Sequence, residues 1–170
     1  MRTKIKVQEL LYGSLLAALA ILIPTVFRGW LQVVIPPFSA TLGSHVPSML
    51  AMFISPWAAA LVGIGSALGF LVTLGPIVAM RAAVHILFGV VGAHFARRGM
   101  PMWAVLAVTA LPHAVGESLV VLPFGYDIYS ALVIVGLGTL LHHGVDSLLT
   151  AALMGSLAKA GFKINKLVSQ

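Results

Sequence analysis

The sequence contains no cysteine, and only 8% of its residues are charged. The absence of thiols excludes disulfide bonds and thiolate chemistry. A soluble domain carries about 25% charged residues, so this composition argues against one. Instead, 60% of the residues are hydrophobic and the mean hydropathy is +1.07. We therefore expect an all-α integral membrane protein, with a single domain over residues 1–170 and very little aqueous part.

Recognisable catalytic motifs are missing as well. No glycine-rich phosphate loop with a following lysine occurs, and no Ser/His/Asp arrangement for nucleophilic catalysis stands out. The six histidines and Asp146 are possible metal ligands, and His142 lies four residues before Asp146. No HExxH-like motif accompanies them. We therefore expect no enzymatic activity, no catalytic residues, no cofactor and no bound metal.

Acidic residues are scarce: the chain has four of them and ten basic residues, which gives a net charge of +6. The basic residues gather near the two termini and in one loop, a distribution that orients a protein in the membrane rather than one that binds nucleic acid. The positive-inside rule places all three groups in the cytoplasm. Only an even number of crossings satisfies this. The groups are Arg2, Lys4 and Lys6; Arg97 and Arg98; and Lys159, Lys163 and Lys166.

Prolines, glycines and short polar turns divide the apolar sequence into six segments. A crossing takes about 20 apolar residues, so the chain has room for a compact bundle of six transmembrane helices with both termini cytoplasmic. We expect a lid-like outer loop at residues 28–41, because Pro36-Pro37 excludes a regular helix there. The expected helices cover residues 9–27, 42–54, 57–74, 77–98, 102–122 and 128–160.

The predicted fourth helix contains Arg81, with His85 one turn further along. A fixed charge inside the membrane costs at least about 2.5–3.5 kcal/mol on insertion scales. This cost is tolerable where Arg81 faces a polar cavity or an anionic ligand. It is also tolerable where the side chain reaches the headgroups or pairs with a carboxylate on another helix.

The predicted orientation brings polar side chains of several segments to a similar depth in the outer half of the membrane. Intramembrane ionisable groups that converge in this way usually mark a site or pathway. We therefore expect an outward-facing cavity with the substrate-binding residues Arg81, His85, Glu117, His45, Trp30, His113, Tyr126 and His142. The alternative is an internal Arg81–Glu117 ion pair that holds the fourth and fifth helices together.

Two stretches carry a resemblance to a known family, and the small residues of the first helix extend it to nearly the whole chain. IPPFSATLGSHVPSMLAMFISPWAAALVG (35–63) and PIVAMRAAVHILFGVVG (76–92) resemble the substrate-binding (S) components of energy-coupling factor (ECF) vitamin transporters. The resemblance implies a multi-pass cell-membrane subunit that captures a small water-soluble vitamin. It also implies partners: a transmembrane coupling subunit and two cytoplasmic ATPase subunits.

The resemblance extends to single residues. The family's small-residue motif on the first helix corresponds to Gly13, Ala17 and Ala18, which are expected to face the coupling subunit. Relatives that bind nickel or cobalt carry a histidine at position two, where this chain has Arg2. The resemblance therefore does not imply a metal cargo.

The cargo remains open between several vitamins. The segment SHVPSMLAMFISP looks most like niacin-type S components, and one arginine suits a carboxylate. Pyridoxine, hydroxymethylpyrimidine and pantothenate are alternatives in the same transporter class. A different class is a self-sufficient proton-coupled carrier, with Glu117, His113 and Asp146 as the relay.

Overall fold

The structure is a computed structural model, and it describes residues 7–161. Several basic residues used for the predicted orientation lie outside the described residues, as does Arg2, on which the argument against a metal cargo relies. They are Arg2, Lys4, Lys6, Lys163 and Lys166.

Five long helices dominate the described residues, and each is long and apolar enough to cross a membrane. The outward sides of these helices carry large apolar side chains, among them Leu15, Leu71, Leu111 and Leu148, as lipid contact requires. The 3₁₀ turn η1 (Leu122–Phe124) follows α5, and the π-helical segment η2 (Ser130–Leu137) leads into α6. The five helices are α1 (Val7–Val26), α3 (Pro56–Thr73), α4 (Pro76–Arg97), α5 (Met102–Val121) and α6 (Gly138–Lys159).

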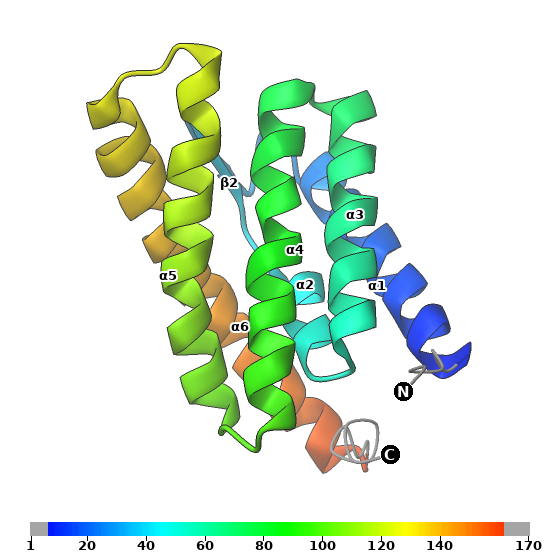
Figure 1. Ribbon diagram of the computed structural model, residues 1–170. Coiled ribbons are helices and arrows are strands. Elements are labelled where there is room, and N and C mark those ends of the chain that lie inside the picture. Colours follow the sequence, from blue (N-terminus) through cyan, green and yellow to red (C-terminus); the bar gives the residue numbers. More distant parts are fainter. Residues whose placement is uncertain (1–6, 162–170) are drawn as a thin grey trace, which may run out of the picture.

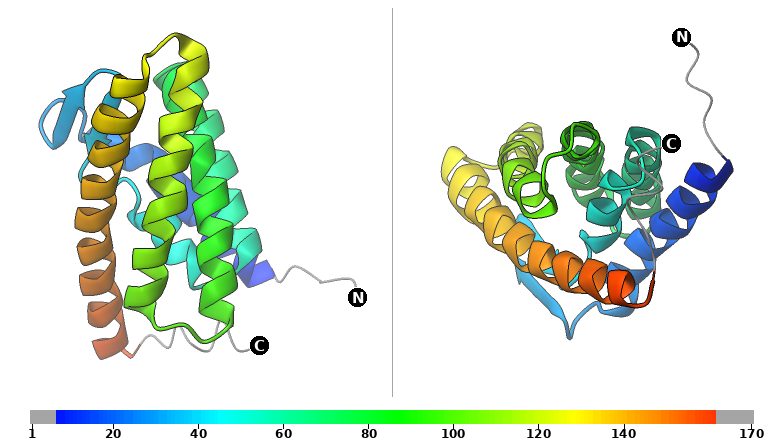
Figure 2. Two further views of the ribbon diagram at one scale, coloured as in Figure 1. Left: turned by 60° about the vertical axis from the view of Figure 1, so that its left-hand side comes forward. Right: turned by 90° about the horizontal axis from the view of Figure 1, so that it is seen from below.

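The long helices surround one short helix, α2 (Val46–Met52). Helices α1, α3, α4 and α5 follow one another around the bundle, and α6 packs on α5 and closes the other side (Figure 1, Figure 2). Small residues permit close packing, as expected where helices meet in lipid. A Cβ at Gly63 of α3 would lie 2.6 Å from the backbone nitrogen of Ile86 of α4.

The prediction of a helix over residues 42–54 is wrong in its length. Helix α2 has seven residues, about 10 Å, which is too short to cross a bilayer. Gly43 has a φ of +80°, which a right-handed helix does not accommodate. In addition, the backbone N–H groups of Gly43 and His45 donate to the carboxylate of Asp146 rather than to a helical partner.

The apolar stretch before α2 forms a β-hairpin, where only a loop was expected from the sequence. Strands β1 (Gln32–Ile35) and β2 (Phe38–Thr41) are antiparallel, and Ile35 pairs with Phe38. Pro36 and Pro37 occupy the tip, where the missing N–H groups do not interrupt the strand pairing. The hairpin lies against α6 and η2 (Figure 2).

The chain begins and ends its described part at the same end of the bundle. The first turn of α1, the α4–α5 connection with Arg97 and Arg98, and the last turn of α6 all lie there (Figure 1). The α3–α4 and α5–α6 connections lie at the opposite end (Figure 1).

Candidate functional site

A small cavity lies beneath the hairpin, next to the Leu42–His45 turn, and all five long helices contribute to its lining. Its volume is about 50 Å³, enough for a few water molecules. Hydrogen-bonding and ionisable side chains make up much of its wall. They are Gln32, Ser39, Thr41, Ser44, His45, Arg81, His85, Glu117 and His142.

The guanidinium of Arg81 lies at the wall of this cavity and is itself buried. Its Nε and Nη2 atoms donate to Oε2 of Glu117 at 3.0 and 2.6 Å. Its Nη1 and Nη2 atoms also donate to the carbonyl oxygens of Pro37 and Ser39 at 3.3 and 3.2 Å. Arg81 therefore joins α4 to α5 and to the hairpin, and the ion pair that the sequence offered as an alternative is present.

The two oxygens of Glu117 have different surroundings. Oε2 accepts the Arg81 hydrogen bonds and a further one from Oγ1 of Thr139, at 2.7 Å. Oε1 instead faces Nε2 of His113 at 3.3 Å and Nε2 of His85 at 3.7 Å. One carboxylate thus connects α4, α5 and α6 at the centre of the bundle.

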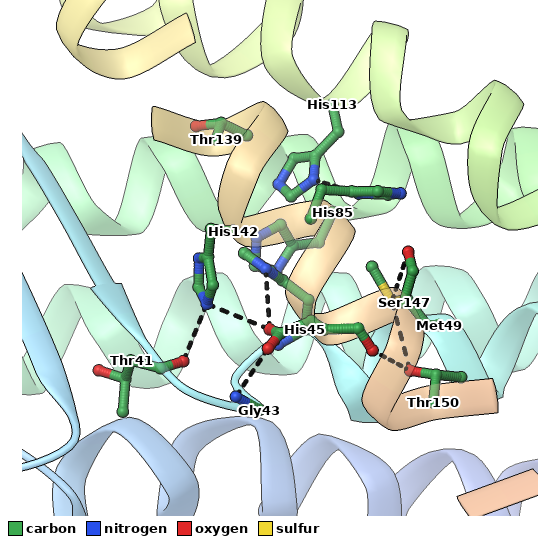
Figure 3. A network of polar contacts seen from close by, with 12 residues as sticks. Thr41, Gly43, His45, Met49, His85, His113, Thr139, His142, Ser147 and Thr150 are labelled. Carbon is green, nitrogen blue, oxygen red and sulfur yellow. Dashed lines mark hydrogen bonds and ion pairs between the residues drawn. The ribbon is translucent and has the colours of Figure 1, made fainter. Parts of the chain in front are cut away.

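Asp146 of α6 holds the non-helical turn before α2. Its Oδ1 accepts the backbone N–H of Gly43 at 2.8 Å, and its Oδ2 accepts that of His45 at 2.9 Å. Oδ2 also lies 3.2 Å from Nε2 of His142, which bonds to the carbonyl of Thr41 at 3.0 Å (Figure 3). Buried backbone groups outside a helix need such partners in an apolar environment.

Five of the six histidines gather next to the cavity. The ring centroids of His45 lie 4.4 to 4.8 Å from those of His85, His113 and His142, and Nδ1 of His113 lies 2.9 Å from Nδ1 of His143. We call the rings of His45, His85, His113, His142 and His143 the histidine cluster. All of them except His143 are labelled in Figure 3. The sixth histidine, His94, is exposed near the end of α4.

The structure brings together most of the predicted substrate-binding residues. Arg81, His85, Glu117, His45 and His142 line the cavity. His113 adjoins it, since its Nε2 atom lies 3.3 Å from Glu117.

Trp30 and Tyr126 lie elsewhere. The Trp30 side chain is 67% exposed and donates from Nε1 to the carbonyl of Val26 at 3.3 Å, as an interfacial aromatic does. Tyr126 packs against the apolar cluster around Phe38 and Val121. The aromatic side chain near the guanidinium is that of Phe38, whose ring centroid lies 5.3 Å from Cζ of Arg81.

The residues expected to face a coupling subunit divide between two environments. Gly13 and Ala17 are buried against α3: a Cβ at Gly13 would lie 3.0 Å from Cδ2 of Leu61, and one at Gly65 would lie 2.9 Å from Cβ of Ala17. Ala18 is exposed on the outer side of α1. Ala18 is therefore the one of the three that a partner can reach without opening the bundle.

Sequence reasoning missed the polar partners that are not ionisable. The carbonyls of Pro37 and Ser39 bind Arg81, and Thr139 binds Glu117, but backbone carbonyls and single threonines carry no distinguishing pattern. Asp146 was expected only as a possible metal ligand or relay group, on the same helix face as His142 four residues earlier. Its bonds to the backbone N–H groups of Gly43 and His45 were not expected.

Comparison with known proteins gives one curated relative at high significance. The chain is 33% identical over 174 residues to the niacin transporter NiaX of Lactococcus lactis subsp. cremoris (strain MG1363), and the alignment covers 92% of this chain and 78% of that protein. No protein-family model matches the chain. No solved structure matches it.

Proposed function

This chain belongs to the niacin transporter NiaX family of ECF S components, and on that premise we propose that it captures niacin for an ATP-driven importer. It is a multi-pass membrane protein of a vitamin-transporter family. The observation that carries the proposal is the cavity between the hairpin and the helices, which has the buried Arg81 guanidinium in its wall.

Niacin at neutral pH is a pyridine ring with a carboxylate, and the cavity offers a group for each part. The Arg81 guanidinium suits a carboxylate through paired N–H donors. The imidazoles of His45, His85 and His142 at the same wall are suited to bind a ring nitrogen or to stack on a ring. This assignment also explains why ionic groups are kept inside an apolar bundle at a free-energy cost.

The cavity must enlarge to admit the ring, since its volume of about 50 Å³ is suited to a few water molecules. The hairpin is the element whose movement frees donors. If it moves away from α4, the Arg81 hydrogen bonds to the carbonyls of Pro37 and Ser39 are released for a carboxylate. The pair with Glu117 does not depend on the hairpin and is retained.

The proposed orientation has six crossings, with both termini and Arg97-Arg98 in the cytoplasm. Five crossings are the long helices. The sixth consists of strand β2, the Leu42–His45 turn and helix α2, which together connect the hairpin to the α2–α3 end of the bundle (Figure 1). Its backbone is suited to membrane depth because Arg81, His142 and Asp146 bind its polar groups.

Within this proposal, release of niacin into the cell requires partners. The family assignment implies an ECF transmembrane coupling subunit and two cytoplasmic ATPase subunits. The outer side of α1 around Ala18 is the proposed coupling surface, because small residues allow close contact between helices in lipid.

A calorimetric titration of the detergent-purified protein tests the cargo. The ligands are nicotinate, nicotinamide, pyridoxine, hydroxymethylpyrimidine and pantothenate. Nicotinate is expected to bind most tightly. Nicotinamide is a matched comparison because it keeps the ring and lacks the anionic charge. Equal binding of the two would contradict the role of Arg81, and absence of nicotinate binding would overturn the proposed cargo.

A transport assay tests the mechanism class. Proteoliposomes with this chain alone are expected to show no uptake, whereas those that also contain the coupling and ATPase subunits take up nicotinate when ATP is present inside. Uptake by the chain alone, driven by a proton gradient, would favour the self-sufficient carrier instead.

A further inference from the structure

The centre of the histidine cluster has the donor set of a metal site. His45 precedes α2, His85 lies on α4, and His113 and Glu117 lie on α5. Each offers one ligand atom, and these four atoms all lie within 4.8 Å of one another. All four side chains are buried. We propose that His45, His85, His113 and Glu117 bind a divalent transition-metal ion.

The distances from Glu117 suit a tetrahedral ion. Ligands that bind zinc at 2.0–2.1 Å are separated by about 3.3 Å along the edge of a tetrahedron. Oε1 of Glu117 lies 3.3 Å from Nε2 of His113 and 3.7 Å from Nε2 of His85. Small rotations of the side chains complete the site, because the widest separation in the set is 4.8 Å.

A chain of hydrogen bonds fixes which nitrogen of His113 is free to bind. Nε2 of His143 lies 2.8 Å from the carbonyl of Leu106, so this nitrogen donates and Nδ1 of His143 accepts. Nδ1 of His113, 2.9 Å away, must then donate. In the neutral ring, Nε2 of His113 therefore carries a lone pair. Such an ordered outer contact is what orients a metal-binding histidine.

This lone pair faces another acceptor, Oε1 of Glu117, at 3.3 Å. Two acceptors at this distance repel each other unless a proton or a metal cation lies between them. Moreover, Nδ1 of His85 and Nε2 of His113 are buried and have no hydrogen-bond partner among residues 7–161, whereas Nδ1 of His45 lies 3.2 Å from Oδ2 of Asp146. Buried polar atoms rarely remain unpaired without a role. A metal ion satisfies Nε2 of His113 and the Glu117 oxygen together.

The donor set selects the class of ion. Imidazole with one carboxylate suits zinc, cobalt and nickel, whereas magnesium and calcium prefer oxygen ligands. No metal was expected from the sequence, because it contains no short ligand motif such as HExxH. The ligands come instead from three segments that only the fold brings together.

The ion has a further consequence, which rests on the proposed function. Arg81 contributes one positive charge, and Glu117 and Asp146 contribute two negative ones, so with neutral imidazoles the polar centre has a net charge of −1. A nicotinate anion increases this to −2, which is costly in an apolar bundle. A divalent ion with nicotinate gives a neutral centre. We therefore expect the metal and nicotinate to bind cooperatively.

Cobalt(II) titration of the metal-free protein, purified through a tag without histidine, tests the site. We expect one equivalent of cobalt with the strong visible absorption of tetrahedral coordination, displaced by zinc. His113→Gln and His85→Gln are expected to weaken binding by about tenfold or more. The matched control is His94→Gln, since His94 is exposed and outside the cluster, and it is expected to bind like the unaltered protein.

Several results would overturn the site. They are no cobalt binding by the folded, unaltered protein, an equal loss in the His94→Gln variant, and unchanged binding in a folded His113→Gln variant. Circular dichroism identifies variants that fail to fold, and the titration of the unaltered protein decides the matter without them. Repeating the titration with nicotinate tests cooperativity. If cobalt binds and nicotinate leaves its affinity unchanged, the metal site stands and joint binding is wrong.

Discussion

Nη2 of Arg81 and Oε2 of Glu117 lie 2.6 Å apart, and both side chains are buried in the bundle. The pair neutralises two charges that would each be costly in an apolar environment. It also connects α4 and α5 directly. Arg81 therefore has two roles, since it contributes to the stability of the fold and is the proposed carboxylate-binding group.

The first prediction concerns stability. Glu117→Gln leaves the Arg81 charge buried without its counterion, and removing one partner of a buried pair costs about 3–5 kcal/mol. The unfolding temperature in detergent should therefore decrease markedly. The double variant Arg81→Met with Glu117→Gln removes both charges and should recover much of the loss without recovering nicotinate binding. Equal unfolding temperatures for the Glu117→Gln variant and the unaltered protein would contradict the structural role.

The second prediction separates binding from folding. Arg81→Lys keeps a positive charge beside Glu117 but loses the planar pair of donors. We expect the protein to fold and nicotinate affinity to fall by about 1.5–3 kcal/mol, the typical contribution of a charged hydrogen bond, as measured by calorimetry. Arg97→Lys, in the exposed last turn of α4, is the control and should bind normally. Unchanged affinity in Arg81→Lys would exclude a paired contact with the carboxylate.

The third prediction concerns the turn before α2. Asp146→Asn retains one acceptor oxygen, whereas Asp146 uses both oxygens for the N–H groups of Gly43 and His45. One buried donor loses its partner, at a cost of about 1–3 kcal/mol. Hydrogen exchange at the amides of residues 43 and 45 should become faster. The control is Asp127→Asn, which alters an exposed hydrogen bond from the backbone N–H of Ser130 and should leave the exchange at residues 43 and 45 unchanged. Equal exchange in both variants would contradict the role of Asp146.

The fourth prediction compares two aromatic residues of the hairpin region. Phe38 is buried and its ring packs against the Arg81 guanidinium, whereas Trp30 is exposed and does not line the cavity. Phe38→Ala should therefore increase the dissociation rate of nicotinate in stopped-flow measurements, and Trp30→Ala should not. The reverse result would return Trp30 to the role of a lid residue over the cargo.

The fifth prediction concerns the coupling surface. Ala18→Leu enlarges a side chain on the exposed side of α1 and should prevent co-purification with the coupling subunit, while nicotinate affinity stays the same. Ala152→Leu makes the same change on the exposed side of α6 and should leave the complex intact. If neither variant affects co-purification, the partner contacts a different surface.

The sequence predicted the parts of the site that depend on burial cost. Arg81 and Glu117 were recognisable because charges in apolar helices are rare, and they do meet in the structure. Periodicity and composition could not predict the short α2, because the turn at Gly43 depends on Asp146, more than 100 positions away in the chain. The position of Trp30 apart from the cavity could not be predicted for a related reason. The aromatic type indicates an interface or a ring partner, and only the fold decides between them.

The β1–β2 hairpin, which we propose to move when niacin enters, has an unusual environment. The side chains of Val33, Val34 and Ile35 on strand β1 are each more than half exposed, and in a bilayer the surroundings of such apolar groups are acyl chains rather than water. Displacement of the hairpin then requires rearrangement of lipid. The rate at which nicotinate enters should therefore depend on acyl-chain order, with slower entry in a saturated, sterol-rich bilayer than in a fluid one at equal affinity.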